Sequence, residues 1–257
     1  MNPDSAISPS ASKVAHVTLA FWIMKILATT LGETAGDFIS MTLGLGYYVG
    51  LLITFAVLAT VLFFQIRSSH FHPLLFWTAI VATTTAGTEV SDFMDRSLDV
   101  GYIGGSAILI AALAATLAVW YARKGSLRVD PLVGRENEIM FWIAVLLSNS
   151  LGTAFGDYLV DDAGLSFIEG AVVAAGAIAV VAALHYLSAL DDVILFWLAF
   201  VFTRPFGATF GDFLTKPIGD GGLNLPREFA SALTLGLLLL TLFVSMRMAS
   251  SRSPSER

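Results

Sequence analysis

Six acidic side chains lie inside long apolar stretches of this chain, where a charge is costly. Four are aspartates at equivalent points of a repeated pattern, and two are glutamates about one helical turn before the first two aspartates. They are Glu33, Asp37, Glu89, Asp92, Asp157 and Asp212. A carboxylate at membrane depth has to be neutralised, paired or hydrated. Carboxylate oxygens are hard donors that suit Mg²⁺, Ca²⁺ or Mn²⁺, so these residues are candidate ligands for a divalent cation.

A Phe-Trp pair precedes each aspartate at a fixed distance. Each Trp lies fifteen residues before its Asp, a glycine lies five residues before the Asp, and Gly or Ser lies directly before it. The pairs are Trp22 with Asp37, Trp77 with Asp92, Trp142 with Asp157 and Trp197 with Asp212. Successive aspartates are 55, 65 and 55 residues apart, which indicates that one unit was duplicated and the resulting pair was duplicated again.

Other polar residues in the same stretches are expected to support the carboxylates. Helical spacing places several hydroxyl and amide groups near them. These supporting residues are Thr30, Thr34, Thr85, Thr88, Asn149, Thr153 and Thr209. Lys25 and Arg204 are the cations within the predicted spans, and both are candidate counter-ions. Six acids against two bases leave a deficit of positive charge that a metal ion or exchangeable protons could fill.

The residue types that are scarce narrow the chemistry. The chain has no cysteine, which excludes disulfides, thiolate metal sites and cysteine nucleophiles. Its four histidines share no repeat position, so a zinc or copper site is less natural than a site for a harder ion. We expect a divalent cation (Mn, Ca or Mg) as substrate and no organic cofactor.

A structural interpretation of the same residues stays open. An Asp that follows Gly near a helix end is often a cap or turn residue, especially at Asp157 and Asp212, where the surrounding charge is lower. The Phe-Trp pairs are expected to be interfacial anchors. The Gly-x-x-x-Gly/Ser segments predict either a local unwinding or a close approach of two helices.

Composition places these residues in a membrane. Apolar residues make up 56% of the chain and charged residues 13%, and the mean hydropathy is +0.78. Eight apolar stretches have about the length that a helix needs to cross a bilayer. They are 17–40, 47–66, 74–94, 102–122, 139–160, 167–187, 193–214 and 229–248. The sequence predicts an all-α integral membrane protein with eight transmembrane helices, built from four parallel two-helix repeats.

The predicted organisation is two halves joined by a linker. The first half, 1–122, holds repeats 17–66 and 74–122, and the second, 139–248, holds repeats 139–187 and 193–248. Residues 123–138 form a cytoplasmic linker, and both the polar start, Met1 to Ser12, and the tail 249–257 are expected to be disordered. Nine basic residues on the side of the termini against three on the other side predict that both termini are cytoplasmic.

The motifs Gly32–Asp37, Gly152–Asp157 and Gly207–Asp212 resemble those of a bacterial family of uncharacterised, repeat-containing, membrane-anchored proteins. The resemblance covers nearly the whole chain and implies a location in the bacterial inner membrane. A looser chemical similarity is to manganese/calcium cation exchangers, which carry a repeated Glu-x-Gly-Asp-Lys/Arg-Ser/Thr motif. In this chain three residues separate Glu33 from Asp37, and Phe38 follows in place of the basic residue.

Three classes of function follow from these observations. The first is an inner-membrane transporter of a divalent metal cation, with manganese as the leading candidate, that could be proton-coupled. The second is a non-transporting scaffold or regulatory protein whose acidic residues are structural. A membrane-embedded enzyme is the least supported, since no catalytic triad or metalloprotease motif occurs. The expected partners are membrane lipid and a metal cation, with no nucleic acid; the sequence does not predict the oligomeric state.

Overall fold

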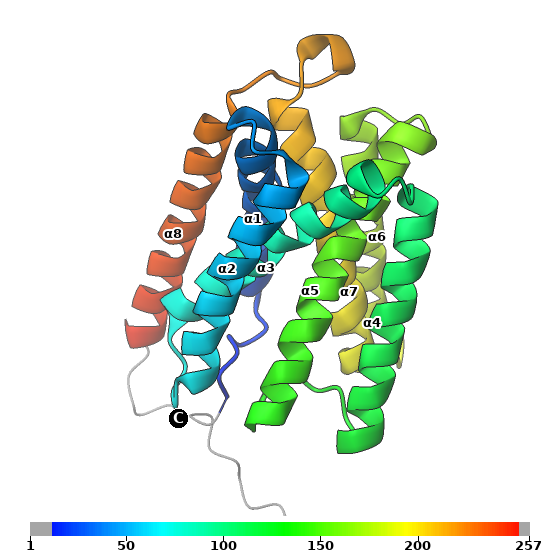
Figure 1. Ribbon diagram of the computed structural model, residues 1–257. Helices are drawn as coiled ribbons and strands as arrows, with labels where there is room; N and C mark the ends of the chain where they lie inside the picture. The colour runs from blue at the N-terminus through cyan, green and yellow to red at the C-terminus, as the bar shows by residue number, and fades with distance from the viewer. Residues whose placement is uncertain (1–11, 252–257) are drawn as a thin grey trace, which may run out of the picture.

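The computed structural model describes residues 12–251, and this part of the chain folds into eight α-helices. The helices are α1 (Leu19–Asp37), α2 (Gly46–Arg67), α3 (Pro73–Asp92), α4 (Tyr102–Lys124), α5 (Arg135–Asp157), α6 (Phe167–Leu187), α7 (Asp192–Thr215) and α8 (Arg227–Ser251). Each predicted repeat therefore holds two helices. Figure 1 shows that they form an upright bundle with both ends of the described chain at its lower end.

The first helix of each repeat continues past or through its aspartate. Short π-helical turns follow α1, α3 and α5: η2 (Phe38–Thr42), η3 (Phe93–Ser97) and η4 (Tyr158–Asp162). Asp212 lies inside α7, which is followed by a short 3-10 turn, η5 (Ile218–Asp220). Asp37, Asp92 and Asp157 make no side-chain capping bond. The interpretation of these three aspartates as caps is therefore wrong.

The four first helices form a closed inner ring. α1 packs against α3, α3 against α5, α5 against α7, and α7 against α1. Gly32 on α1 faces Thr84 on α3, and Gly36, one turn further along, faces Thr88. Since the facing positions advance together on both helices, these two neighbours run parallel.

The repeated glycines let the inner helices approach closely. A Cβ built at the first glycine of each motif would lie no more than 2.9 Å from an atom of the neighbouring helix. The facing pairs are Gly32 with Thr84, Gly87 with Asn149, Gly152 with Arg204 and Gly207 with Thr29. All four partners stand seven residues after the repeated Trp. Of the two predicted roles for the motif, close helix approach is therefore the one observed.

The second helices form an outer layer. α2 packs on α3, α4 on α5, α6 on α7 and α8 on α1, so each outer helix covers the inner helix of the next repeat. Within the described residues, six helices are long and apolar enough to cross a membrane: α2, α4, α5, α6, α7 and α8. α1 and α3 do not meet that standard; they carry Lys25, Glu33 and Glu89 together with several threonines. The two polar helices thus lie in the inner ring, away from the outer surface.

Aromatic side chains close the ring at the end that carries the termini. In each case the Phe of one repeat contacts the Trp of the next repeat, with ring centroids 5.5 to 6.3 Å apart. These pairs are Phe21 with Trp77, Phe76 with Trp142, Phe141 with Trp197, and Phe196 with Trp22. Trp77, Trp142 and Trp197 are buried, so the predicted role as interfacial anchors is wrong for these three.

The connection between the halves packs below this aromatic layer. It is shorter than the predicted 123–138, because α4 extends to Lys124 and α5 begins at Arg135. Val129 and Leu132 of the connection and Val14 of the N-terminal segment are buried in the same apolar cluster as the aromatic rings.

The two ends expected to be disordered fall largely outside the structure. Residues 1–11 and 252–257 lie outside the described part of the chain. At the borders of that part, Ser12 is buried and α8 extends to Ser251. The expectation of disorder is therefore wrong at Ser12 and at the first residues of the tail.

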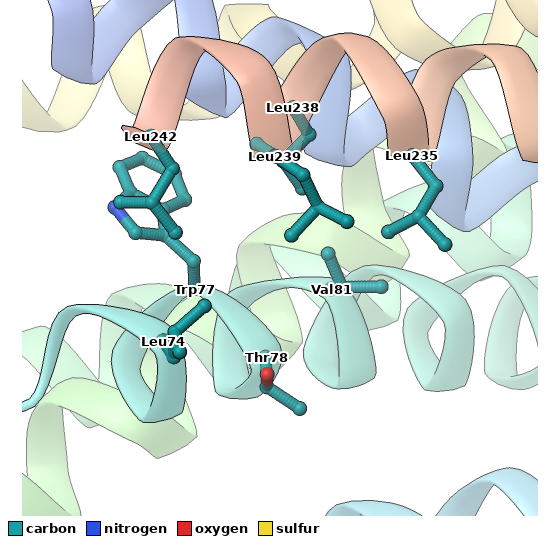
Figure 2. A pocket seen from close by; sticks show the side chains of 8 residues that line it. All are labelled: Leu74, Trp77, Thr78, Val81, Leu235, Leu238, Leu239 and Leu242. Atoms are coloured by element: carbon teal, nitrogen blue, oxygen red, sulfur yellow. The ribbon is translucent and has the colours of Figure 1, made fainter. Parts of the chain in front are cut away.

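An apolar groove of about 130 Å³ lies between α3 and α8. Figure 2 shows leucines of α8, such as Leu235 and Leu239, facing Trp77 and Val81 of α3. The residues that line the groove carry no charged group, and Thr78 provides the hydroxyl. The groove therefore has no part in the charged site described below.

We expect Gly32→Val to destabilise the ring. The added side chain would overlap Thr84, whose backbone carbonyl carbon lies only 2.9 Å from the Cβ position, and overpacking of this kind costs about 1–3 kcal/mol. The matched control is Gly176→Val on α6, since a Cβ there meets nothing within 4 Å. Thermal unfolding in detergent should show a lower midpoint for Gly32→Val than for Gly176→Val. Equal midpoints would contradict the close contact.

Candidate functional site

The four repeated aspartates meet at the end of the ring opposite the aromatic layer. Each follows the second small residue of its motif, and each is at most 5% exposed. α1 runs without interruption from Trp22 to Asp37, which places the carboxylate about 22 Å along the helix from the indole. The inner helices thus deliver four buried carboxylates to one level of the bundle.

Two basic residues join these aspartates in pairs. Arg96 of η3 lies 3.2 Å from Asp92 and 3.4 Å from Asp157. Lys216, just after α7, lies 3.0 Å from Asp212 and 3.1 Å from Asp37. A shift of 120 residues carries Arg96 onto Lys216 and Asp92 onto Asp212, so the two arrangements are equivalent in the duplicated halves.

Each of these bases connects one half of the chain to the other. Arg96 joins the second repeat to the third, and Lys216 joins the fourth to the first. The Lys216–Asp212 contact is an ion pair without hydrogen-bond geometry, whereas Lys216 donates a hydrogen bond to Asp37. Burial lowers the pKa of Lys216, but the nearby carboxylates of Asp212 and Asp37 more than offset this effect and raise it above its ordinary value. Lys216 is therefore charged at neutral pH.

Arg227, the first residue of α8, adds a third base. Its Nε lies 3.3 Å from Asp37, and its guanidinium donates to Thr42 at 3.4 Å. The predicted spans leave out Arg96, Lys216 and Arg227, and no pairing of these bases with the carboxylates was predicted from the sequence. The signal that would have identified two of them is spacing, since Arg96 and Lys216 each lie four residues after an aspartate and so on the same helical face.

Glu33 belongs to the centre of this cluster. Carboxylate oxygens of Glu33, Asp157 and Asp212, from three different repeats, lie within 4.8 Å of one another. Arg204 of α7 donates to Glu33 at 2.7 Å and also to Thr88. Arg204 is fully buried, and its Nε and Nη1 have no hydrogen-bond partner among the described residues. Arg204 is therefore a counter-ion of Glu33.

Lys25 lies closer to the aromatic layer. Its ammonium group donates to Asn149 at 3.0 Å and sits 4.1 Å from the centre of the Phe200 ring. Asn149 in turn donates to Thr83 at 3.2 Å. The partner of Lys25 is thus an amide and an aromatic face, where the sequence predicted a carboxylate.

Glu89 does not join the group formed by Glu33, Asp157 and Asp212. The two glutamates occupy different repeat positions, because Glu33 is four residues before its aspartate and Glu89 three. Glu33 is equivalent to Thr88, and Glu89 is equivalent to Thr34. That difference of one residue places Glu89 on another face of its helix, where its carboxyl group lies next to Gly50 of α2.

The remaining polar candidates are distributed unevenly. Thr88 and Asn149 contact the buried charges, as described above. The residues that donate to carbonyl groups of their own helices are Thr34, Thr85, Thr153 and Thr209. Thr30 is buried one turn before Glu33. The hydroxyl groups therefore mainly satisfy helix carbonyls, and among these candidates Thr88 is the one that bonds to a carboxylate of the cluster.

The buried layer of charged side chains contains more acidic groups than basic groups. Five carboxylates meet four bases, namely Arg96, Lys216, Arg227 and Arg204. Removal of charges from water costs several kcal/mol per ion, and pairing offsets that cost only when the geometry is good. The carboxylate oxygens of Glu33, Asp157 and Asp212 are close enough to share one additional positive ion.

Fold and site together define a bundle of four helix pairs around a charged centre. The chain belongs to the family described as Repeat of Unknown Function (DUF347), whose model matches residues 20–71, 75–126, 140–190 and 195–251. Each match spans most of one inner helix and all of the following outer helix. Neither the curated proteins nor the solved structures contain a match to this chain.

We expect Arg96→Gln to destabilise the protein by leaving Asp92 and Asp157 without their shared base. Loss of one partner of a buried ion pair costs about 3–5 kcal/mol, and the 28% exposure of the Arg96 side chain reduces that expectation to about 1–3 kcal/mol. Arg123→Gln, which breaks the exposed pair with Glu136, should destabilise the protein much less, because solvent screens that pair. Denaturant unfolding of both variants measures the difference. Equal losses would show that Arg96 is not a structural counter-ion.

Proposed function

We propose that this protein transports a divalent cation across the bacterial inner membrane, with manganese as the leading candidate. The eight helices would all span the bilayer, with both termini in the cytoplasm. Glu33, Asp157 and Asp212 would hold the ion, and Asp37 and Asp92 would flank it. The looser chemical similarity to manganese/calcium exchangers is consistent with this proposal, since both place acidic residues in duplicated helices.

One observation carries the proposal. Carboxylate oxygens of Glu33, Asp157 and Asp212 lie within 4.8 Å of one another although all three side chains are buried. Like charges at that distance repel strongly in a medium of low dielectric constant. A cation bound between them would remove this repulsion, and oxygen ligands suit Mn²⁺, Mg²⁺ or Ca²⁺.

The two shared bases suggest how a carboxylate could be freed to bind an ion. Arg96 is shared by Asp92 and Asp157, and Lys216 is shared by Asp212 and Asp37. Each base can release one aspartate and stay paired with the other. Asp157 and Asp212 would therefore become available to an incoming cation without leaving Arg96 or Lys216 unpaired.

A second candidate function is a membrane scaffold or regulatory protein with structural carboxylates. The ion pairs support it, because every repeated aspartate has at least one basic partner within 3.4 Å. In that case Arg96 and Lys216 supply part of the positive charge that a metal ion would otherwise provide. The two candidates differ in whether neutralising a carboxylate changes flux.

Transport in reconstituted vesicles distinguishes them. Wild-type protein should admit Mn²⁺ to a trapped metal-sensitive dye, and Asp157→Asn and Glu33→Gln should abolish the signal because each removes a ligand charge. Glu169→Gln is the matched control, since Glu169 caps α6 outside the cluster. Size-exclusion profiles confirm folding of each variant. No flux of Mn²⁺, Mg²⁺ or Ca²⁺ through folded wild-type protein would refute the proposal and favour the scaffold.

The orientation can be tested directly, because the chain has no cysteine to interfere with labelling. Ser126 and Asp220 are exposed and belong to connections at opposite ends of the bundle. In intact spheroplasts, a membrane-impermeant maleimide should label Asp220→Cys and leave Ser126→Cys unlabelled until the membrane is opened. The reverse pattern would overturn the assignment of cytoplasmic termini.

A further inference from the structure

Glu89 is a buried carboxyl group that the cation cluster leaves unused. It lies on α3 with no exposed surface, and neither of its oxygens has a hydrogen-bond partner among the described residues. A Cβ on Gly50 of α2 would lie 2.5 Å from Oε2, and a Cβ on Gly36 of α1 would lie 3.6 Å from Oε1. The carboxyl group therefore occupies a space between three helices that two glycines leave open.

Equivalent positions in the other repeats carry no acid. They hold Thr34, Ala154 and Thr209, on inner helices that pack against α8, α4 and α6. Thr34 accepts a hydrogen bond from Ser231 of α8 at 2.9 Å, so Ser231 faces Thr34 as Gly50 faces Glu89. At the Thr34 position, two neutral hydroxyl groups are enough to fill the space between the helices. Packing alone therefore does not explain why Glu89 is a carboxyl group.

Among residues 12–251, no basic group lies within ion-pair distance of Glu89, as judged by the ion pairs that Glu33, Asp37 and Asp92 form instead. The charged groups that act most strongly on it are Asp37 and Glu33 of α1, and both are acidic. On its own helix, the next acid, Asp92, is paired with Arg96. α2 presents Gly50, and η2 presents the hydroxyl of Ser40. A buried carboxylate without a partner carries a large free-energy penalty, and protonation removes it.

The oxygen of Ser40 is suited to accept a hydrogen bond from a protonated Glu89. The Ser40 hydroxyl donates to the carbonyl of Gly36 at 3.0 Å, so its hydrogen is already used. The oxygen of Ser40 then has only acceptor capacity left. A protonated Glu89 can donate to that oxygen, whereas a carboxylate would face a lone pair.

We propose that Glu89 is a proton-binding site, separate from the cation cluster, that is occupied at neutral pH. This part of the inference depends only on the geometry around Glu89. A second part rests on the proposed function: a cation that binds at Glu33 lowers the negative charge near Glu89, and Glu89 then releases its proton. Glu89 would in that case be the residue that couples proton movement to cation transport.

Infrared spectroscopy of purified protein tests the first part. At neutral pH the wild type should show the carbonyl band of a protonated carboxyl group, and Glu89→Gln should lack it. Glu169→Gln is the control, because Glu169 caps α6 outside the cluster and its loss should leave the band unchanged. A band that persists in Glu89→Gln, or no band in the wild type, would overturn the assignment of the proton to Glu89.

Flux in vesicles tests the second part. Glu89→Gln mimics the protonated side chain, so cation-driven proton movement should fall to the level of vesicles without protein. Exchange of one Mn²⁺ for another should continue, since the cluster keeps its ligands. Loss of both activities in a folded variant would make Glu89 a ligand of the cation, and retention of both would refute coupling. If the wild type moves no cation while the infrared band behaves as expected, the proposed function fails and the proton site stands.

Discussion

The close approach of neighbouring inner helices holds this bundle together. Two small residues, one turn apart, let each inner helix lie against the backbone of the next one. Repeated four times, this contact closes a ring among the described helices. The same motif places an aspartate directly after its second small residue, so closing the ring also gathers the four carboxylates. Packing and charge are therefore set by one short sequence pattern.

Bringing the carboxylates together costs electrostatic free energy, and the basic residues that offset this cost are not distributed equally among the four repeats. Arg96 and Lys216 serve the four aspartates in a two-fold manner that follows the duplication of the halves. Glu33 and Arg204 break this symmetry, because the equivalents of Glu33 are Thr88, Thr153 and Ala208. Because of this departure from symmetry, Glu33 lies beside Asp157 and Asp212. We propose that these three carboxylates share a cation.

Much of the fold follows from the sequence, and less of the site does. The repeat spacing predicts two helices per repeat, and the glycine motif predicts close packing. The sequence did not predict which helices lie inside. Each of the four inner helices carries at least two buried charged residues, and their inner position also buries Trp77, Trp142 and Trp197. Arg96 and Lys216 were missed because they follow the predicted spans, although their spacing from the aspartates favours pairing. Glu33 and Glu89 differ by one residue in register, and only the helix geometry shows that they face different neighbours.

Anomalous scattering from crystals soaked in Mn²⁺ would show whether the carboxylates bind a cation. We predict a manganese peak on the axis of the ring, within coordination distance of Glu33, Asp157 and Asp212. It also predicts that Arg96 and Lys216 remain bound to Asp92 and Asp37 in that state. A fully soaked crystal without a peak there, and with all the ion pairs unchanged, would contradict the claim that these carboxylates bind a cation.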